Sequence, residues 1–301
     1  MHNELNMTPN LPTALNGAVH ELPQTAHKVV LYSAGSGASL LLIHSVNAVA
    51  SAAEVRPLFD HYRANRCVYA LDLPGYGLSD RRDQAYTVRV MTDAIVAAAQ
   101  WIRAQHGGAA LDAMAVSLSC EFLARAAADN PGLFKSLTLV SPTGFQGGQE
   151  LREATGQTRY KPALDKFLRG PGWGGFLFRQ LTRPAVIRYF LERTWGSKQI
   201  DEPLWTYNCL SARQPNAEFA PLAFLSGILF STDIHTVYGQ LTLPALVIHG
   251  TRGDFTNYKN LNIVSSQPNW QVQVLPTGAM PYFEVPQAYF ACQDAFFAAH
   301  P

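Results

Sequence analysis

The feature that most constrains the fold is an alternation of apolar strand patterns with helical patterns in the first half of the chain. Five short apolar runs predict strands, and they read HKVVLYS, SLLLIH (39–44), CVYALD (67–72), LDAMAV (111–116) and SLTLVS (136–141). Between the third and fourth runs, apolar residues recur at helical spacing from Val88 to Ile102, before Gly107 and Gly108. This alternation predicts an α/β fold with a mostly parallel central sheet flanked by helices.

The pattern changes between about residues 141 and 241. No strand of comparable strength occurs there, and several short helical patterns carry many aromatic residues. Strand patterns return at 243–250 and 270–275, and a helical pattern closes the chain. We therefore predict a flexible leader over 1–27, a core formed by 28–141 and 242–301, and an inserted helical cap over 142–241.

Composition and charge narrow the functional classes. The chain has 301 residues, 48% of them hydrophobic, and a net charge of +1 with Lys and Arg scattered along it. Neither nucleic acid nor an anionic membrane surface is an expected partner. No apolar run reaches the roughly 20 residues of a membrane span, and the first residues lack a signal-peptide pattern.

The four cysteines are Cys67, Cys120, Cys209 and Cys292. They form no CxxC pair and no Cys/His cluster, which argues against a zinc site. Scattered thiols without an export signal indicate a reducing compartment, so we expect a cytoplasmic protein. We expect a monomer or homodimer, between which the sequence does not decide.

The sharpest local motif is Ala-Val-Ser-Leu-Ser at 115–119, between a buried-strand pattern and a helical pattern. A nucleophile elbow needs small residues two positions before and after the serine, because the strand turns sharply into the helix. Ala115 and Ser119 meet this need without the usual glycines. The alternative is that Ser117 is an ordinary helix N-cap.

Several motifs, in order, resemble those of the α/β-hydrolase superfamily, in particular its cap-bearing branch of esterases and C–C bond hydrolases. They are LLLIHSVNA, YALDLPGYGLSD, DAMAVSLS, LVSPTG and VIHGTRGD, and the resemblance runs from about residue 28 to 299. A serine at 117 differs from the carboxylate nucleophile of the related dehalogenases and epoxide hydrolases, and it favours acyl chemistry.

The resemblance implies a role for individual residues. Ser117 corresponds to the nucleophile and Asp254 to the triad acid, in the superfamily's chain order. Backbone N–H groups of Val46 and Leu118 correspond to the oxyanion hole. Ser45 stands where glycine is usual. The alternative for Asp254 is a solvated loop carboxylate.

The family's last motif, G-H-x-P-x-x-E-x-P, matches residues 278–286 except that Ala279 replaces the histidine. No histidine lies between His249 and His300. Three explanations remain open: a base deleted by nature or by design, a substitute base, or a pocket used only for binding. His235, near the junction of cap and core, is the best-placed substitute, whereas Tyr282 is a poor base because a phenol titrates near pH 10.

The remaining histidines read as structural, since His44 and His249 close strands and His61 and His106 lie on helices. His44, Ser45 and Tyr282 are expected to line the substrate pocket.

The leading hypothesis is a serine hydrolase for a small to medium apolar ester or related carbonyl compound, with no metal or organic cofactor. The first alternative is a catalytically silent member of the fold that binds a small apolar ligand. Lyase or isomerase chemistry in the same pocket is a third.

Overall fold

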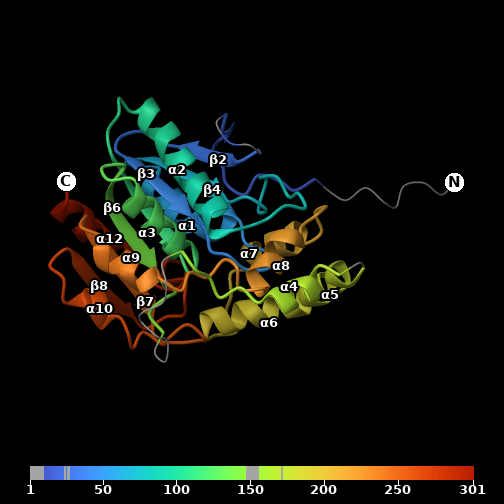
Figure 1. The fold of residues 1–301 in the computed structure, drawn as a ribbon. Coiled ribbons are helices and arrows are strands. Elements are labelled where there is room, and N and C mark those ends of the chain that lie inside the picture. Colours follow the sequence, from blue (N-terminus) through green and yellow to red (C-terminus); the bar gives the residue numbers. More distant parts are fainter. Residues whose placement is uncertain (1–9, 24, 26–27, 147–155, 171) are drawn as a thin grey trace.

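The computed structural model describes residues 10–23, 25, 28–146, 156–170 and 172–301 (Figure 1). One eight-stranded sheet runs through it in the order β1-β2-β4-β3-β5-β6-β7-β8. β1 and β2 are antiparallel to their neighbours, and all other pairs are parallel. The strands are β1 (Ala18–Glu21), β2 (Val30–Ala34), β3 (Ser39–Ile43), β4 (Cys67–Asp72), β5 (Leu111–Val116), β6 (Phe134–Val140), β7 (Ala245–Gly250) and β8 (Trp270–Leu275).

Helices cover both faces of this sheet. The helices of the described residues are the 3₁₀ helix η1 (Ala52–Val55), α1 (Arg56–Tyr62), α2 (Val88–Gln105), α3 (Ser119–Asp129), α4 (Pro162–Leu168), α5 (Trp173–Leu181), α6 (Pro184–Trp195), α7 (Glu202–Ser211), α8 (Phe219–Leu225), α9 (Ile234–Gln240), α10 (Asn262–Ser265), α11 (Pro281–Glu284) and α12 (Pro286–Ala299). The predicted fold class, a mostly parallel sheet flanked by helices, is confirmed.

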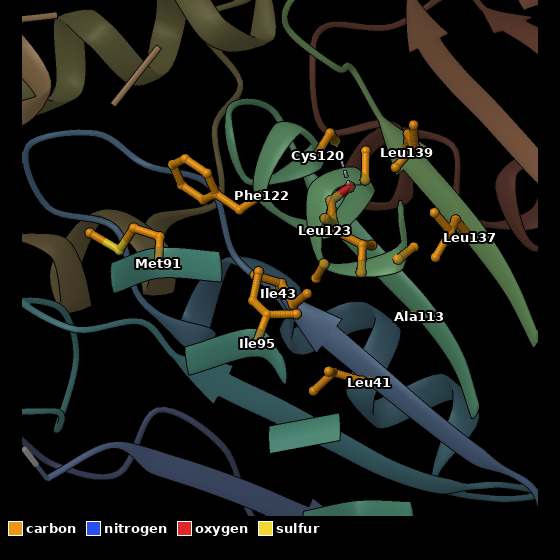
Figure 2. Packing of buried hydrophobic residues seen from close by; sticks show 14 of the residues in the cluster. Leu41, Ile43, Met91, Ile95, Ala113, Cys120, Phe122, Leu123, Leu137 and Leu139 are labelled. Atoms are coloured by element: carbon orange, nitrogen blue, oxygen red, sulfur yellow. Dashed lines mark hydrogen bonds between the residues drawn. The ribbon is translucent and has the colours of Figure 1, made fainter. Parts of the chain in front are cut away.

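Alternate residues of each central strand enter two separate cores. One core joins the sheet to α2, α3, α9 and α10, and the other joins it to α1 and α12. Figure 2 shows part of the first core, with Met91 and Ile95 of α2 and Phe122 of α3 near Ile43 of β3. Burial on both faces explains why these strands read as continuous apolar runs.

Helices α4 to α8 follow one another between β6 and α9, and Figure 1 shows them grouped at one end of the molecule. α9 then packs against α3 and α10. Residues 147–155, at the start of the predicted cap, lie outside the described residues. The boundaries 142 and 241 stay a prediction.

The leader prediction for 1–27 is wrong for part of that range. β1 pairs with β2 from Ala18↔Ser33 to Glu21↔Val30, and Leu11, Leu15 and Leu22 are buried. The sequence pattern hid this strand because β1 is an edge strand with little apolar burial of its own, and its stability comes from backbone pairing. Residues 1–9, 24, 26 and 27 lie outside the described residues.

Candidate active site

Ser117 occupies a strained turn between β5 and α3. Its φ is +56°, in the left-handed region that non-glycine residues rarely adopt. Two backbone bonds fix the turn: the Ser117 N–H donates to the carbonyl of Val140 on β6 (2.8 Å), and the Cys120 N–H donates to the carbonyl of Ser117 (3.1 Å). The side chain is half-buried. Ser117 is not the N-cap of α3, because the helix begins only at Ser119 and Leu118 precedes it. The strained strand-to-helix turn is the geometry that the prediction of a nucleophile at Ser117 requires.

The two small residues beside the elbow are fully buried. Ala115 lies in β5, and the Ser119 hydroxyl donates to the carbonyl of His44 (2.6 Å) at the end of β3. Ser119 therefore does more than avoid a clash. It ties the first turn of α3 to the loop that is expected to supply the second oxyanion donor.

His44 is held by backbone through both ring nitrogens. Its Nε2 accepts from the Leu73 N–H (3.0 Å), so the ring proton sits on Nδ1, which donates to the carbonyl of Ser45 (2.6 Å). An imidazole with both nitrogens engaged in this way serves structure, as the sequence analysis expected.

A buried carboxylate organises the next residues. Glu54 accepts the Ser45 N–H (2.8 Å) and the Asn47 side-chain amide (2.8 Å), and that same amide also donates to the Ser45 hydroxyl (2.9 Å). Glu54 is 1% exposed, and sequence reasoning missed it because no motif marks it. In the described part of the chain, the N–H groups of Val46 and Leu118 donate to no protein acceptor.

Asp254 lies in the exposed loop after β7 and is held by α6. Its carboxylate accepts two bonds from the Arg193 guanidinium of α6, at 2.5 Å (Nε to Oδ2) and 2.7 Å (Nη2 to Oδ1). The two side chains are 41% and 49% exposed, and the carboxylate raises the pKa of Arg193. In this arrangement the predicted triad acid orients an arginine rather than an imidazole.

Ala279 lies beneath the C-terminal end of α6. Its N–H donates to the carbonyl of Thr194 (2.9 Å), and its carbonyl accepts from the Ser141 hydroxyl (2.8 Å) at the end of β6. The Asp254 N–H donates to the preceding carbonyl, that of Arg193 (3.3 Å). The loops that carry Asp254 and Ala279 are thus both bonded to the end of α6, at the adjacent carbonyls of Arg193 and Thr194.

The same helix end explains a glycine in this loop. A Cβ on Gly278 would lie 2.4 Å from the carbonyl oxygen of Trp195 and 2.5 Å from that of Thr194. The Gly278 N–H donates to Glu284 (2.7 Å), whose carboxylate also pairs with Arg252. The family's glycine and glutamate positions therefore fix this loop beneath the cap even though its histidine is absent.

His235, predicted near the junction of cap and core, is buried in α9, the helix that packs on α3. Its neighbour Asp233 pairs with Arg125 of α3 (2.6 Å). On the same side of α3, Glu121 accepts from the Thr143 hydroxyl (2.5 Å), and burial raises its pKa to about 7.

His249 is a second histidine near the strand ends. Its ring stacks on Tyr258 (centroids 3.8 Å apart), its Nδ1 bonds the Gly250 carbonyl (2.9 Å), and burial lowers its pKa. Tyr258 also interacts with Ser141, whose hydroxyl donates to the carbonyl of Ala279. His249 therefore lies near the loop of Ala279, a proximity that no local motif indicates.

Tyr282 lies in α11 with its ring 5.4 Å from that of Tyr289. Its hydroxyl and that of Tyr76, whose ring is 5.5 Å from His44, are buried and have no hydrogen-bond partner among the described residues. Burial raises the pKa of both phenols, and the charge of Glu54 adds to it. Because a buried hydroxyl without a partner costs about 1–3 kcal/mol, such groups mark places for water or a polar ligand atom.

A pocket of about 470 Å³ lies where the end of α6 meets α11. Its lining is mixed rather than apolar, and it includes Trp195, Gln199, Asp201, Arg252, Phe283 and Glu284. Among the described residues no group of three or more His, Cys, Asp or Glu side chains could hold a metal ion. None of the helices in the described ranges combines the length and apolarity needed to cross a bilayer.

Comparison with solved structures finds proteins of the same fold. Similar solved structures include a serine hydrolase involved in carbazole degradation (14% identity, 94% of this chain and 99% of that chain, TM-score 0.72). A 2-hydroxy-6-oxo-6-phenylhexa-2,4-dienoate hydrolase from a Rhodococcus strain is also similar (17%, 94% and 100%, TM-score 0.72). So is a probable hydrolytic enzyme from Pseudomonas aeruginosa (16%, 95% and 96%, TM-score 0.73). No curated protein sequence matches the chain.

At these identities the structural similarity bears on the fold alone. The family assignment comes from the sequence, because the model of the alpha/beta hydrolase fold family matches residues 38–285. The chain therefore belongs to the alpha/beta hydrolase fold family.

Proposed function

We propose that this protein is a serine hydrolase acting on a small to medium apolar ester or related carbonyl compound, with a weakened proton-transfer step. The observation that carries the proposal is the positive φ of Ser117. A non-glycine residue in that region costs about 1–2 kcal/mol, and glycine would remove the cost. A serine in place of glycine at this strained turn, at the family's nucleophile position, supports a chemical role for its hydroxyl.

In this reaction the Ser117 hydroxyl oxygen bonds to the substrate carbonyl carbon, the alkoxy group leaves, and water then hydrolyses the acyl-enzyme. The N–H groups of Val46 and Leu118 would stabilise the oxyanion that forms in each step. The hydroxyl proton needs an acceptor, and no imidazole stands at 279. His235 remains the substitute named by sequence, and His249, whose pKa is lowered by burial and whose ring stacks on Tyr258 near Ser141, is a second candidate.

The alternative is a silent member of the fold that binds a small ligand. Two observations favour it: Asp254 is fully engaged by Arg193, and the Ala279 backbone is bonded to the cap and to Ser141. The buried hydroxyls of Tyr76 and Tyr282 would then donate to ligand oxygen atoms.

A fluorophosphonate probe separates these functions, because it reacts only with an activated serine. We expect slow labelling of the wild-type chain that Ser117→Ala abolishes. Loss of labelling in His249→Ala but not in His235→Ala identifies the first as the base, and the reverse result identifies the second. Absence of labelling in the folded wild-type protein, over hours and across pH 6 to 9, contradicts the hydrolase and supports the binding function.

A further inference from the structure

Two helices of the cap segment expose aromatic side chains next to one another. Phe167 of α4, Trp173 and Phe176 of α5 are 56%, 43% and 45% exposed. The ring centroids of Phe167 and Trp173 are 5.5 Å apart, and those of Trp173 and Phe176 are 5.7 Å apart. A continuous group of three exposed aromatic rings is unusual on a monomer surface and marks an interaction site.

The segment that carries these rings is rich in basic residues. Residues 156–200 contain nine Lys or Arg and two Asp or Glu, a net +7 in a chain whose total is +1. Arg169, Arg188 and Arg193 are paired with carboxylates. A second set is exposed, and within the described residues it has no carboxylate at ion-pair distance: Lys161, Lys166, Arg179 and Arg183. We call these four residues and the three aromatic rings the aromatic-basic face.

We propose that the aromatic-basic face docks on an anionic lipid surface. Trp and Phe side chains partition into the headgroup region, and Lys or Arg near the surface gains attraction to anionic lipid. Both contributions are needed, because a few rings or a few charges alone bind weakly. A second copy of the chain fits less well, since a two-fold contact through this face would bring two basic surfaces together.

The place of the face in the fold suits peripheral docking. Figure 1 shows α4 and α5 at the end of the molecule away from α12 and β8. α5 has nine residues, too short to span a bilayer. The net charge of +1 and the scattered basic residues argue against an anionic membrane partner for the chain as a whole, whereas residues 156–200 carry a local excess of basic residues together with the exposed rings. The proposal does not depend on the reactivity of Ser117.

Vesicle co-sedimentation tests the proposal. We expect the full chain to bind phosphatidylcholine vesicles containing 30% phosphatidylserine and not pure phosphatidylcholine vesicles, with binding lost in high salt. Lys166→Gln should lower the partition coefficient by about fivefold, and Lys166→Gln with Arg179→Gln by about 25-fold. Arg89→Gln, an exposed arginine on α2 of the core, is the matched control and should change it less than twofold.

The tryptophan signal gives a second readout. In vesicles with brominated acyl chains, Trp173 should be quenched because the other tryptophans, at 101, 195, 205 and 270, are partly or fully buried. Trp173→Phe should keep binding and lose this quenching, whereas Trp173→Ala should lose binding. Equal binding by the wild type and Lys166→Gln/Arg179→Gln refutes the proposal, as does failure of the wild type to bind either vesicle. Concentration-dependent dimerisation abolished by Trp173→Ala, or binding to single-stranded DNA in place of vesicles, would assign the face to another partner.

Discussion

Installing a histidine at position 279 tests the physical account of this site most directly. The Ala279 backbone is already fixed, with its N–H on Thr194 and its carbonyl on Ser141, so Ala279→His changes only the side chain. A positioned general base contributes about 10²–10⁴-fold. Hydrolysis of p-nitrophenyl butyrate should therefore rise at least about 100-fold over the wild type, and Ser117→Ala in the same background should abolish the gain.

Arg193 should reduce that gain only slightly. A new imidazole must share Asp254 with the guanidinium, but a pair this exposed to water is screened and contributes little. We therefore expect Ala279→His alone to give most of the effect, and the double variant with Arg193→Gln to add no more than a few-fold. The rate should rise with pH as the new imidazole loses its proton.

The substitution also enlarges a side chain that is only 6% exposed, so overpacking of about 1–3 kcal/mol is expected. Ala279→Phe is the matched control, since it adds a similar flat ring without a base. Thermal unfolding and near-UV circular dichroism verify folding in each variant. If Ala279→His with Arg193→Gln folds and hydrolyses the ester no faster than Ala279→Phe, the absent base is not what limits Ser117.

Three further outcomes follow from the same contacts. Glu54→Ala leaves the N–H of Ser45 and the amide of Asn47 without their acceptor, so urea unfolding should show a loss of about 1–3 kcal/mol per stranded group, whereas Glu54→Gln should lose less. Glu121 has a pKa raised from 4.5 to about 7 by burial, so the folded state holds its proton longer than the unfolded state. Stability from this group is present below pH 4.5 and is lost as pH rises to 7, by up to about 3 kcal/mol, and Glu121→Gln should flatten that slope in urea titrations. Ser117→Gly should unfold at higher temperature than Ser117→Ala by an amount equivalent to about 1 kcal/mol, because glycine relieves the positive φ; equal stability would show that the turn is unstrained.

Strand positions were the easiest part to predict. β4 and β5 have the predicted bounds, because strands buried on both faces must be apolar throughout their length. β8, a largely exposed strand at the other edge of the sheet, also has the predicted bounds. β1 escaped prediction because its four residues are largely exposed and depend on pairing with β2. An edge strand carries its stabilising contacts in the backbone, where sequence leaves little trace.

The site residues also divide into those that local sequence identifies and those that depend on the fold. Ser117 could be located because its turn demands small neighbours, and that demand is local. Glu54 and Arg193 could not, since each acts on residues brought to it by the fold: Glu54 on Ser45, nine positions away, and Arg193 on Asp254, across the boundary between cap helix and core loop. The environment of His249 likewise depends on Tyr258 and Ser141 meeting at the strand ends.

The sequence by itself determined the order of strands and helices, the elbow, and the absence of a histidine at 279, because each of these depends on neighbouring residues and their spacing. The tertiary structure alone decided which groups surround position 279. Folding brought the last carbonyls of α6 onto the loops of Asp254 and Ala279 and set an arginine on the predicted acid. Contacts between residues far apart in the chain depend on how helices pack, and packing responds to the whole molecule rather than to any one motif.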